Sequence, residues 1–361
     1  MKARRIQVSF KVCVIGCGGH STRVHGPSYK KYADLYPGTI LAACCDLDPI
    51  RAKEFQHMFG FKACYTDIDE MLDTEKPDAV CLVVKESFIA ALSVKVIEKG
   101  YPILMEKPPG LSKEETLAIV AAVEKNRVPN KVAFNRWYIP VMVKLKEMMK
   151  ANLKLEKVHQ IRYDFYRTGR TEPDFYTTAI HGISAVAFLA ESPFDEIHFT
   201  YQELPSLGEH VANIYMDCRF ASGVIAHLHF CPVAGVVIER ATVNSLHQTI
   251  FAELPIWASH DNPGRLVHFK NGHIISDTRG DLFTDSSDMY ITNGFYAENE
   301  SFFNMIRNNA AQEGGVELAP QIVEVADCIR LRKKRYARSQ NIDRTSSEAR
   351  ELGKNYEGDQ T

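Results

Sequence analysis

The sequence predicts two domains: an α/β domain on a parallel sheet, then an α+β domain on a mostly antiparallel, open-faced sheet. Strand and helix patterns alternate over the first 135 residues, as in βαβ units. After Pro140, runs rich in β-branched and aromatic residues follow one another across short polar turns, as in an antiparallel sheet. We expect domains at 1–135 and 136–338, with a final helix returning to the first domain, and a polar tail at 339–361.

The first domain reads as strands that are each followed by a helix. Strands are expected at Lys11–Ile15, Ile40–Cys45, Ala79–Val84, Ile103–Met105 and Lys131–Phe134, and helices at Ser21–Leu35, Pro49–Phe59, Ser87–Lys99 and from Ser112 onward. Ser112 with Glu115 forms a capping-box pattern. Continuous apolar strands such as Ala79–Val84 indicate a sheet that is covered on both faces.

The second domain reads as strands interrupted by one long helix. Strands are expected at Lys157–Arg167, Glu196–Glu203, Ala212–Phe220, Gly223–Cys231, Val236–Val243 and His247–Ala252, and helices at Val141–Ala151, Phe175–Ala190, Phe295–Asn308 and Ala319–Tyr336. Too few helices remain to cover both faces of this sheet. Its outer face is therefore expected to be open.

Composition excludes several classes of protein. The chain has 43 basic and 45 acidic side chains, a net charge of −2, so it offers no electrostatic basis for a nucleic-acid or membrane partner. No apolar run approaches the roughly 20 residues that span a bilayer, and no signal-peptide core follows the basic N-terminus. The nine cysteines are odd in number and lie mostly in strand-like runs, which predicts free thiols and a cytoplasmic protein.

A glycine-rich turn follows the first strand. Gly16, Gly18 and Gly19 precede a helix start, with His20 beside them, and Asp46 ends the second strand. Such a turn lets the backbone N–H groups approach a pyrophosphate, and the acid accepts hydrogen bonds from ribose hydroxyls. This pattern predicts a Rossmann domain that binds NAD, with NADP disfavoured by Asp46 but kept open by Arg51.

Lys107 lies at the carboxyl end of the fourth strand, in Met105-Glu106-Lys107-Pro108-Pro109. Ligands of open α/β sheets bind at that edge, so Glu106 and Lys107 are candidate site residues. From position alone, a solvated Glu-Lys pair remains the alternative.

Here the chain resembles the glucose–fructose oxidoreductase and inositol dehydrogenase family. The resemblance runs through VIGCGGHSTRVHGP, CCDLDP, MEKPPGLSKEE, FNRWYIP, TTAIHGISAVAFLA and GFYAENESFF. It implies an oxidoreductase in which Lys107 lies between the nicotinamide and the reacting hydroxyl, with a Lys107–Pro108 bond that is often cis. Asn135 and Arg136 match the family's crossover between domains, and Val84 starts a loop beside the cofactor.

The resemblance also implies the substrate side of the site. His181 matches the family's helix histidine, the proton acceptor when an alcohol is oxidised. The aspartate four residues before it is Thr177 here, which leaves basicity, substrate choice or catalysis itself altered. Tyr296 matches a substrate-facing position, and Trp137 after Arg136 is a candidate to pack on a sugar ring. Without the resemblance, His181 and Tyr296 read as ordinary packing residues, and His227 with His229 as a polar sheet face; no metal is expected.

The predicted function is hydride transfer between NAD and a sugar, inositol or related polyol, in a homo-oligomer, a dimer or tetramer, that pairs through the open sheet. Three alternatives stay open: an NAD-retaining glycosidase, a catalytically silent NAD- or sugar-sensing regulator, and a cyclic imine or biliverdin-type reductase.

Overall fold

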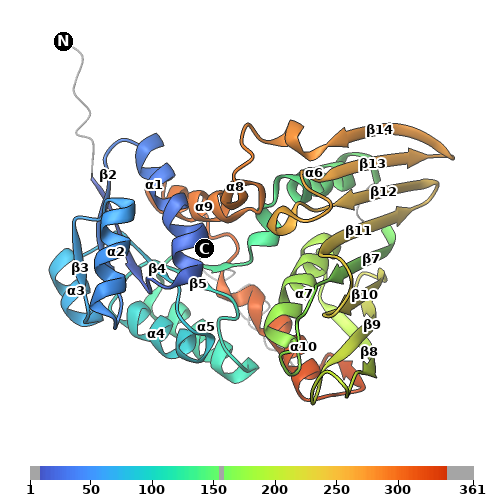
Figure 1. Cartoon of the computed structure of the whole chain (residues 1–361), viewed down its shortest axis with the longest axis horizontal. Helices are drawn as coiled ribbons and strands as arrows, with labels where there is room; N and C mark the ends of the chain where they lie inside the picture. Colours follow the sequence, from blue (N-terminus) through green and yellow to red (C-terminus); the bar gives the residue numbers. More distant parts are fainter. Residues whose placement is uncertain (1–8, 154–157, 340–361) are drawn as a thin grey trace, which may run out of the picture.

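In the computed structural model, which describes residues 9–153 and 158–339, two sheets lie side by side with helices between them (Figure 1). The predicted tail at 339–361 lies, beyond Ser339, outside the described residues. No helix in these two described ranges is long and apolar enough to cross a membrane.

The first sheet has six parallel strands in the order β3-β2-β1-β4-β5-β6. Its strands are β1 (Phe10–Ile15), β2 (Thr39–Cys45), β3 (Ala63–Tyr65), β4 (Ala79–Leu82), β5 (Ile103–Glu106) and β6 (Asn130–Ala133). The order reverses between β1 and β4, the point where an open α/β sheet binds its ligands. The predicted doubly wound domain is confirmed.

The helices of this domain are α1 (Gly26–Leu35), α2 (Pro49–Phe59), α3 (Ile68–Glu75), α4 (Glu86–Glu98) and α5 (Lys113–Asn126). A π-helical turn, η1 (Ser21–His25), precedes α1 and lengthens this first helical segment. That added length helps to explain why Asp46 follows the glycine turn by more than the roughly 20 residues usual for this motif. Asp48 caps α2 and Ser112 caps α5 through side-chain oxygens, as the capping pattern at Ser112 predicts.

The second sheet has nine strands in the order β14-β13-β12-β11-β7-β10-β9-β8-β15. They are β7 (Val158–Tyr166), β8 (Phe194–Glu203), β9 (Ala212–Phe220), β10 (Ile225–Cys231), β11 (Ile238–Ser245), β12 (Gln248–Glu253), β13 (Arg265–Lys270), β14 (His273–Arg279) and β15 (Arg335–Ala337). All neighbours pair antiparallel except β7 with β10. The mostly antiparallel sheet is confirmed.

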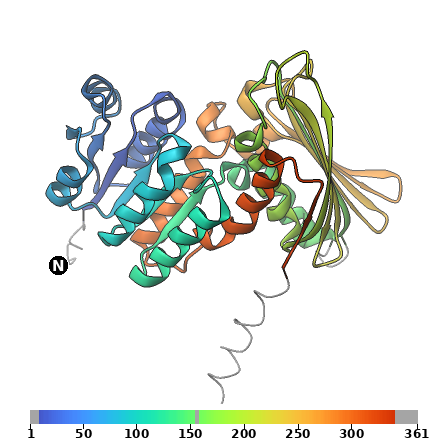
Figure 2. The ribbon, with the colours of Figure 1, turned by 90° about the horizontal axis from the view of Figure 1, so that it is seen from below.

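Helices cover one face of this sheet and leave the other open, as Figure 2 shows. They are α6 (Pro140–Met148), followed by a π turn at Met149–Leu153, α7 (Tyr176–Ala190) and α10 (Ala319–Arg330). The short α8 (Met289–Thr292) leads into α9 (Phe295–Arg307), which packs on α1 of the first domain. The described chain therefore crosses between the two sheets more than once.

Three parts of the element prediction were wrong. β3 and α3 were missed because they are short, three and eight residues, and mostly polar or half-buried. The β13–β14 hairpin was missed although Asn271 and Gly272, both at positive φ, carry the usual signal for such a turn. The last helix ends at Arg330, not Tyr336, which lies in strand β15 at the sheet edge.

Candidate active site

The glycine turn after β1 is shaped by close packing on one side and open space on the other. Gly16 has φ 99°, and a Cβ atom there would lie 2.0 Å from the carbonyl oxygen of Val83. A Cβ atom at Gly18 or Gly19 would meet nothing within 4 Å. Gly16 therefore has to be glycine for the turn to form, whereas the other two leave their N–H groups open to a ligand.

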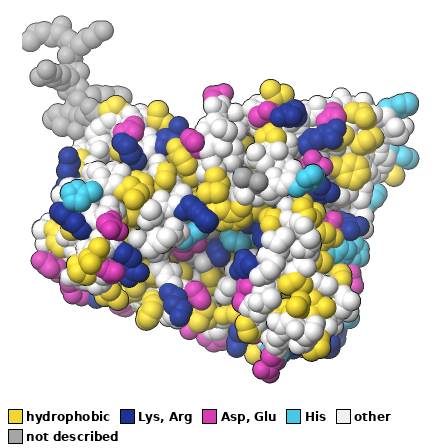
Figure 3. Space-filling model, in the orientation of Figure 1, with side chains coloured by type: hydrophobic (Ala, Val, Ile, Leu, Met, Phe, Trp, Pro, Cys, Tyr) yellow, Lys and Arg dark blue, Asp and Glu magenta, His cyan; other side chains and the backbone are white. Residues whose placement is uncertain are grey.

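A groove of about 690 Å³ runs along the carboxyl ends of the parallel strands and reaches α7 of the second domain. Figure 3 shows the surface hollowed between the two lobes, with basic and histidine side chains gathered there. Many predicted site residues line the groove: Gly16, Gly18, Gly19, His20, Asp46, Val84, Glu106, Lys107 and Thr177. Arg51, Lys85 and Glu86 lie on the same lining.

Asp46 closes the glycine turn at the end of β2. Its Oδ2 atom accepts a hydrogen bond of 2.9 Å from the main-chain N–H of Cys17. Its Oδ1 atom accepts from the N–H of Asp48 at 2.9 Å and from the Arg51 guanidinium at 3.1 Å. The carboxylate is thus fixed at the groove, beside a half-exposed arginine.

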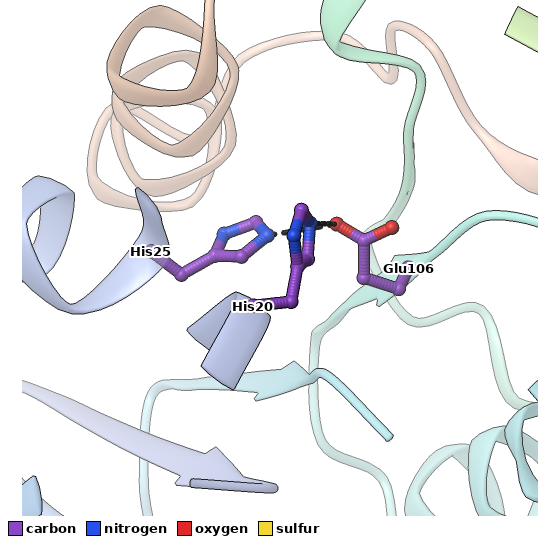
Figure 4. Close-up of side chains that lie close together, drawn as sticks. All are labelled: His20, His25 and Glu106. Carbon is purple, nitrogen blue, oxygen red and sulfur yellow. Dashed lines mark hydrogen bonds and ion pairs between the residues drawn. The ribbon is translucent and has the colours of Figure 1, made fainter. Parts of the chain in front are cut away.

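Glu106, the last residue of β5, is held by two histidines from the glycine-turn helix (Figure 4). Its Oε1 atom lies 2.8 Å from Nε2 of the buried His25 and 3.2 Å from Nε2 of His20. Burial alone would raise the pKa of Glu106, but the two histidines hold it well below its ordinary value. The free Oε2 atom accepts a hydrogen bond of 3.0 Å from the main-chain N–H of Lys107.

The tautomer of His25 follows from its other neighbour. The amide nitrogen of Asn299, on α9, donates to the carbonyl oxygen of Phe295 at 2.7 Å and to Nδ1 of His25 at 3.1 Å. Nδ1 of His25 is therefore an acceptor, and its Nε2 carries the proton that Glu106 accepts.

His20, His25 and Glu106 also form the group in the described ranges whose ligand atoms, all within 4.8 Å of one another, could hold a metal ion. A metal would require a bare Nε2 on His25, where Asn299 places the proton. The contacts therefore favour a hydrogen-bond network that fixes Glu106.

Lys107 links the two domains. It follows β5 directly, and its bond to Pro108 is cis, as the resemblance implies. Its Nζ atom donates a hydrogen bond of 3.2 Å to the carbonyl oxygen of Thr177 in the first turn of α7. Burial lowers the pKa of Lys107, with Arg136 and Arg170 acting in the same direction and Glu106 opposing them.

His181 lies one helical turn after Thr177 and presents a ring nitrogen, Nδ1, that is buried and has no hydrogen-bond partner. Burial lowers its pKa well below 6.5, and the nearby Arg136, Lys107, Arg167 and His20 lower it further. The imidazole is therefore neutral near pH 7 and able to accept a proton.

Four other predicted site residues are engaged elsewhere. Asn135 bonds to the carbonyl oxygen of Asn293, and Arg136 is buried against Glu239. Trp137 stacks on Phe188 in the core of the second domain, with its Nε1 donating to the carbonyl oxygen of Ser184. Tyr296 donates to Glu300 and packs in the core that α9 shares with α1.

The structure also brings in residues that the sequence analysis did not single out: His25, Asn299, Glu239, Arg167 and Glu298. The Glu239 carboxylate is surrounded by Tyr163 and by the guanidinium groups of Arg136 and Arg167. Burial alone would raise the pKa of Glu239, but these neighbours lower it to about 2. Glu298, on α9, is buried with no partner for either oxygen, and burial together with Glu106 raises its pKa well above 4.5.

Comparison with known proteins agrees with this architecture. Residues 10–134 match a model described as an oxidoreductase family with an NAD-binding Rossmann fold. Over these residues the chain is similar to the Gfo/Idh/MocA family. Inositol 2-dehydrogenase from Corynebacterium glutamicum is 25% identical over 210 residues, 55% of this chain and 59% of that one. D-apiose dehydrogenase from Paraburkholderia graminis is 32% identical over 129 residues, 36% and 33% of the two chains.

A solved structure of levoglucosan dehydrogenase, in complex with NADH and levoglucosan, superposes on this chain with a TM-score of 0.78 and 16% identity. It covers 92% of this chain and 100% of that one, so the fold is shared along both domains. The chain spans less than two thirds of the length of the curated relatives it matches.

Proposed function

We propose that this protein is a member of the Gfo/Idh/MocA family along its whole length and an NAD(P)-dependent dehydrogenase or reductase acting on a CH–OH group of a sugar, inositol or related polyol. Relatives named for inositol and apiose support this substrate class. Assembly into a homo-oligomer through the open face of the nine-stranded sheet is part of the same proposal.

The observation that carries the proposal is the meeting of Lys107 and the His181 helix. Lys107 ends a strand of the cofactor domain, whereas His181 lies on α7 of the other domain. The Lys107–Thr177 hydrogen bond, 3.2 Å long, brings the ammonium group to within one helical turn of the imidazole. A cation that donates and a neutral base with a free nitrogen are the two groups that oxidation of an alcohol requires.

The groove suits a dinucleotide. The space above Gly18 and Gly19 leaves N–H groups at a helix start open to a pyrophosphate, and Asp46 stands where a ribose hydroxyl would bind. A carboxylate there repels a 2′-phosphate, which favours NAD. Arg51, 3.1 Å from Asp46, is the group that would accept NADP if Asp46 were displaced.

In the oxidative direction, bound nicotinamide supplies the hydride acceptor. The Lys107 ammonium donates a hydrogen bond to the substrate oxygen and stabilises the negative charge that develops on it. The neutral imidazole of His181 takes the hydroxyl proton. Glu106, fixed by His20 and His25, holds the main-chain N–H of Lys107 and so positions the lysine.

The test is a screen of sugars, inositols and sugar acids with NAD and NADP, followed by the absorbance of the reduced cofactor. We expect turnover of at least one of them, loss of turnover in Lys107→Met, and NADH binding by calorimetry that Lys107→Met leaves intact. Full activity of Lys107→Met, or no heat from either nucleotide with the wild-type protein, would refute the proposal.

A second candidate, a silent NAD- or sugar-sensing regulator, is favoured by one observation. Within residues 9–153 and 158–339, Lys107 forms no ion pair with a carboxylate, and His181 has cations around it. NAD binding with no turnover across the whole screen would select this alternative.

A further inference from the structure

The substrate end of the groove carries more positive than negative charge. Within the part of the chain that the structure describes, Lys107 takes part in no ion pair, and its Nζ atom contacts a neutral carbonyl oxygen. Lys107 is half-buried on the groove lining, and a charge that is partly removed from water is stabilised by a partner of opposite charge. A group that supplies the missing negative charge would therefore stabilise Lys107.

Beneath this end, Arg136 and Arg167 share a single carboxylate. Glu239 accepts from Nε of Arg136 at 3.2 Å and from Nη2 at 2.6 Å, and it also pairs with Nη2 of Arg167. The side chains of Arg136, Arg167 and Glu239 are 2%, 6% and 0% exposed. Two guanidinium groups against one carboxylate leave one positive charge in excess, in a region that water does not screen.

Glu106 opposes part of this positive charge, because its carboxylate stabilises the charged form of Lys107. Lys107, Arg136 and Arg167 against Glu239 and Glu106 still leave one positive charge in excess. Glu298 adds little negative charge, because burial raises its pKa well above 4.5 and so disfavours its charged form. Lys85 and Glu86 on the groove lining carry opposite charges. Arg170 pairs with Glu172 and donates to Oγ1 of Thr178 at 3.0 Å.

The first turn of α7 adds to the positive field. This 15-residue helix has no acidic residue in its first turn and no side-chain cap, and it begins beside Lys107. Unpaired N–H groups give a helix start a partial positive charge that attracts anions. The start of α7, the Lys107 ammonium group and the two buried guanidinium groups thus all favour a negatively charged ligand at this end of the groove.

We propose that the substrate is an acidic sugar, such as a uronic or aldonic acid, whose carboxylate lies against Lys107 and the start of α7. The inference rests on the proposed function and narrows its substrate class. One positive charge is in excess at this end of the groove. A carboxylate, with one negative charge, balances it better than a phosphate group, which carries nearly two. The bound carboxylate would also offset the cations around His181 and make the imidazole a stronger base.

The experiment compares matched pairs that differ in one carboxylate: D-glucose with D-glucuronate, and D-galactose with D-galacturonate. Glucose 6-phosphate is the phosphate arm. With whichever of NAD and NADP gives the faster turnover, we expect kcat/KM for the acid to exceed that for the neutral sugar by about tenfold or more, the effect of a charge-assisted hydrogen bond. The ratio of the two kcat/KM values should fall with added salt, which screens the charges. Thr177→Asp should remove or reverse the preference, whereas the neutral, similar-sized Thr177→Asn should keep it.

Equal or better use of the neutral sugars, or a preference for the phosphate over both acids, would overturn the inference and leave the dehydrogenase proposal standing. If nothing turns over although NADH binds, the dehydrogenase proposal fails separately. Calorimetry of the NADH-loaded protein then decides the inference, because glucuronate should still bind more tightly than glucose; equal affinities would overturn it.

Discussion

The ammonium nitrogen of Lys107 and the carbonyl oxygen of Thr177 lie 3.2 Å apart, and this hydrogen bond joins the end of β5 to the first turn of α7. The contact uses one of the three donors of the ammonium group, which leaves two for a substrate oxygen. The protonation of Lys107 therefore controls what the site can do.

We expect kcat/KM for alcohol oxidation to fall as pH rises through the pKa of Lys107. Burial, Arg136 and Arg170 lower that pKa, so the loss should begin below the 10.5 of an ordinary lysine. Lys107→Arg, whose guanidinium stays charged, should lose activity but also lose this alkaline limb. Identical alkaline limbs in pH profiles of the two proteins would show that another group titrates.

His181 should act as a neutral base down to acidic pH. Because its pKa lies well below 6.5, lowered first by burial, kcat/KM should show no acid limb from this residue between pH 7.5 and 6.5. His181→Gln should reduce kcat by roughly 10²- to 10⁴-fold, the usual contribution of a general base. NADH affinity, measured by fluorescence, should be unchanged; an equal loss of NADH binding would point to a structural role instead.

Asp46 should set the choice between NAD and NADP. Asp46→Ser removes the carboxylate that repels a 2′-phosphate and leaves Arg51 with one carboxylate partner, Asp48 at 3.4 Å, in place of two. We expect the ratio of NADP to NAD affinity to rise by about tenfold or more, the effect of a single charge-assisted contact. Asp34→Asn, which removes an exposed carboxylate of α1 paired with Lys30, is the control and should leave the ratio unchanged.

Glu239→Gln should be strongly destabilising. It leaves the buried guanidinium groups of Arg136 and Arg167 without a counter-charge, at a cost of about 3–5 kcal/mol in the free energy of unfolding. The pKa of Glu239, at about 2, is lower than in the unfolded chain, so its contribution should be lost as pH falls from about 4.5 toward 2. Denaturant unfolding should show a far smaller effect for Asp277→Asn, in the exposed pair with Arg265; equal effects would contradict the assignment.

Glu298→Gln should stabilise the protein at neutral pH. Burial and Glu106 raise the pKa of Glu298 in the folded state, so the folded protein holds this proton to higher pH than the unfolded chain, which releases it above pH 4.5. Stability of the wild type should therefore fall as pH rises above 4.5, and the variant should not share that fall. Thermal melts at pH 5 and pH 8 check this: the difference in Tm between the two proteins should be larger at pH 8.

The first sheet and one edge of the site were predictable from sequence because parallel strands end at a common edge. Gly16, Asp46 and Lys107 each follow a strand, so chain order alone brings them together. β3 and the β13–β14 hairpin were missed for opposite reasons: the first has too few residues for a pattern, whereas the second carries an Asn-Gly turn that was passed over.

The long-range contacts that orient the site residues and shift their pKa values could not be predicted from the sequence. Glu106 meets His25 across 81 residues, His25 meets Asn299 across 274, and Arg136 meets Glu239 across 103. Nothing in a local pattern marks such partners, because each is an ordinary helix or strand residue until the fold places it. The role of His181 was accessible only through resemblance, since one histidine on an apolar helix face is usually a packing residue.

The packing of α9 on α1 means that the nucleotide-binding half is not assembled from its own stretch of chain. Phe302 and Phe303 of α9 are fully buried in the same cluster as Tyr29 and Tyr32 of α1. A fragment ending near residue 134 would lack α9, so the rings of Tyr29 and Tyr32 would be exposed to water, and the fragment would tend to aggregate rather than fold. Ribosomal synthesis must therefore reach the last third of the chain before the first domain can close its hydrophobic interior.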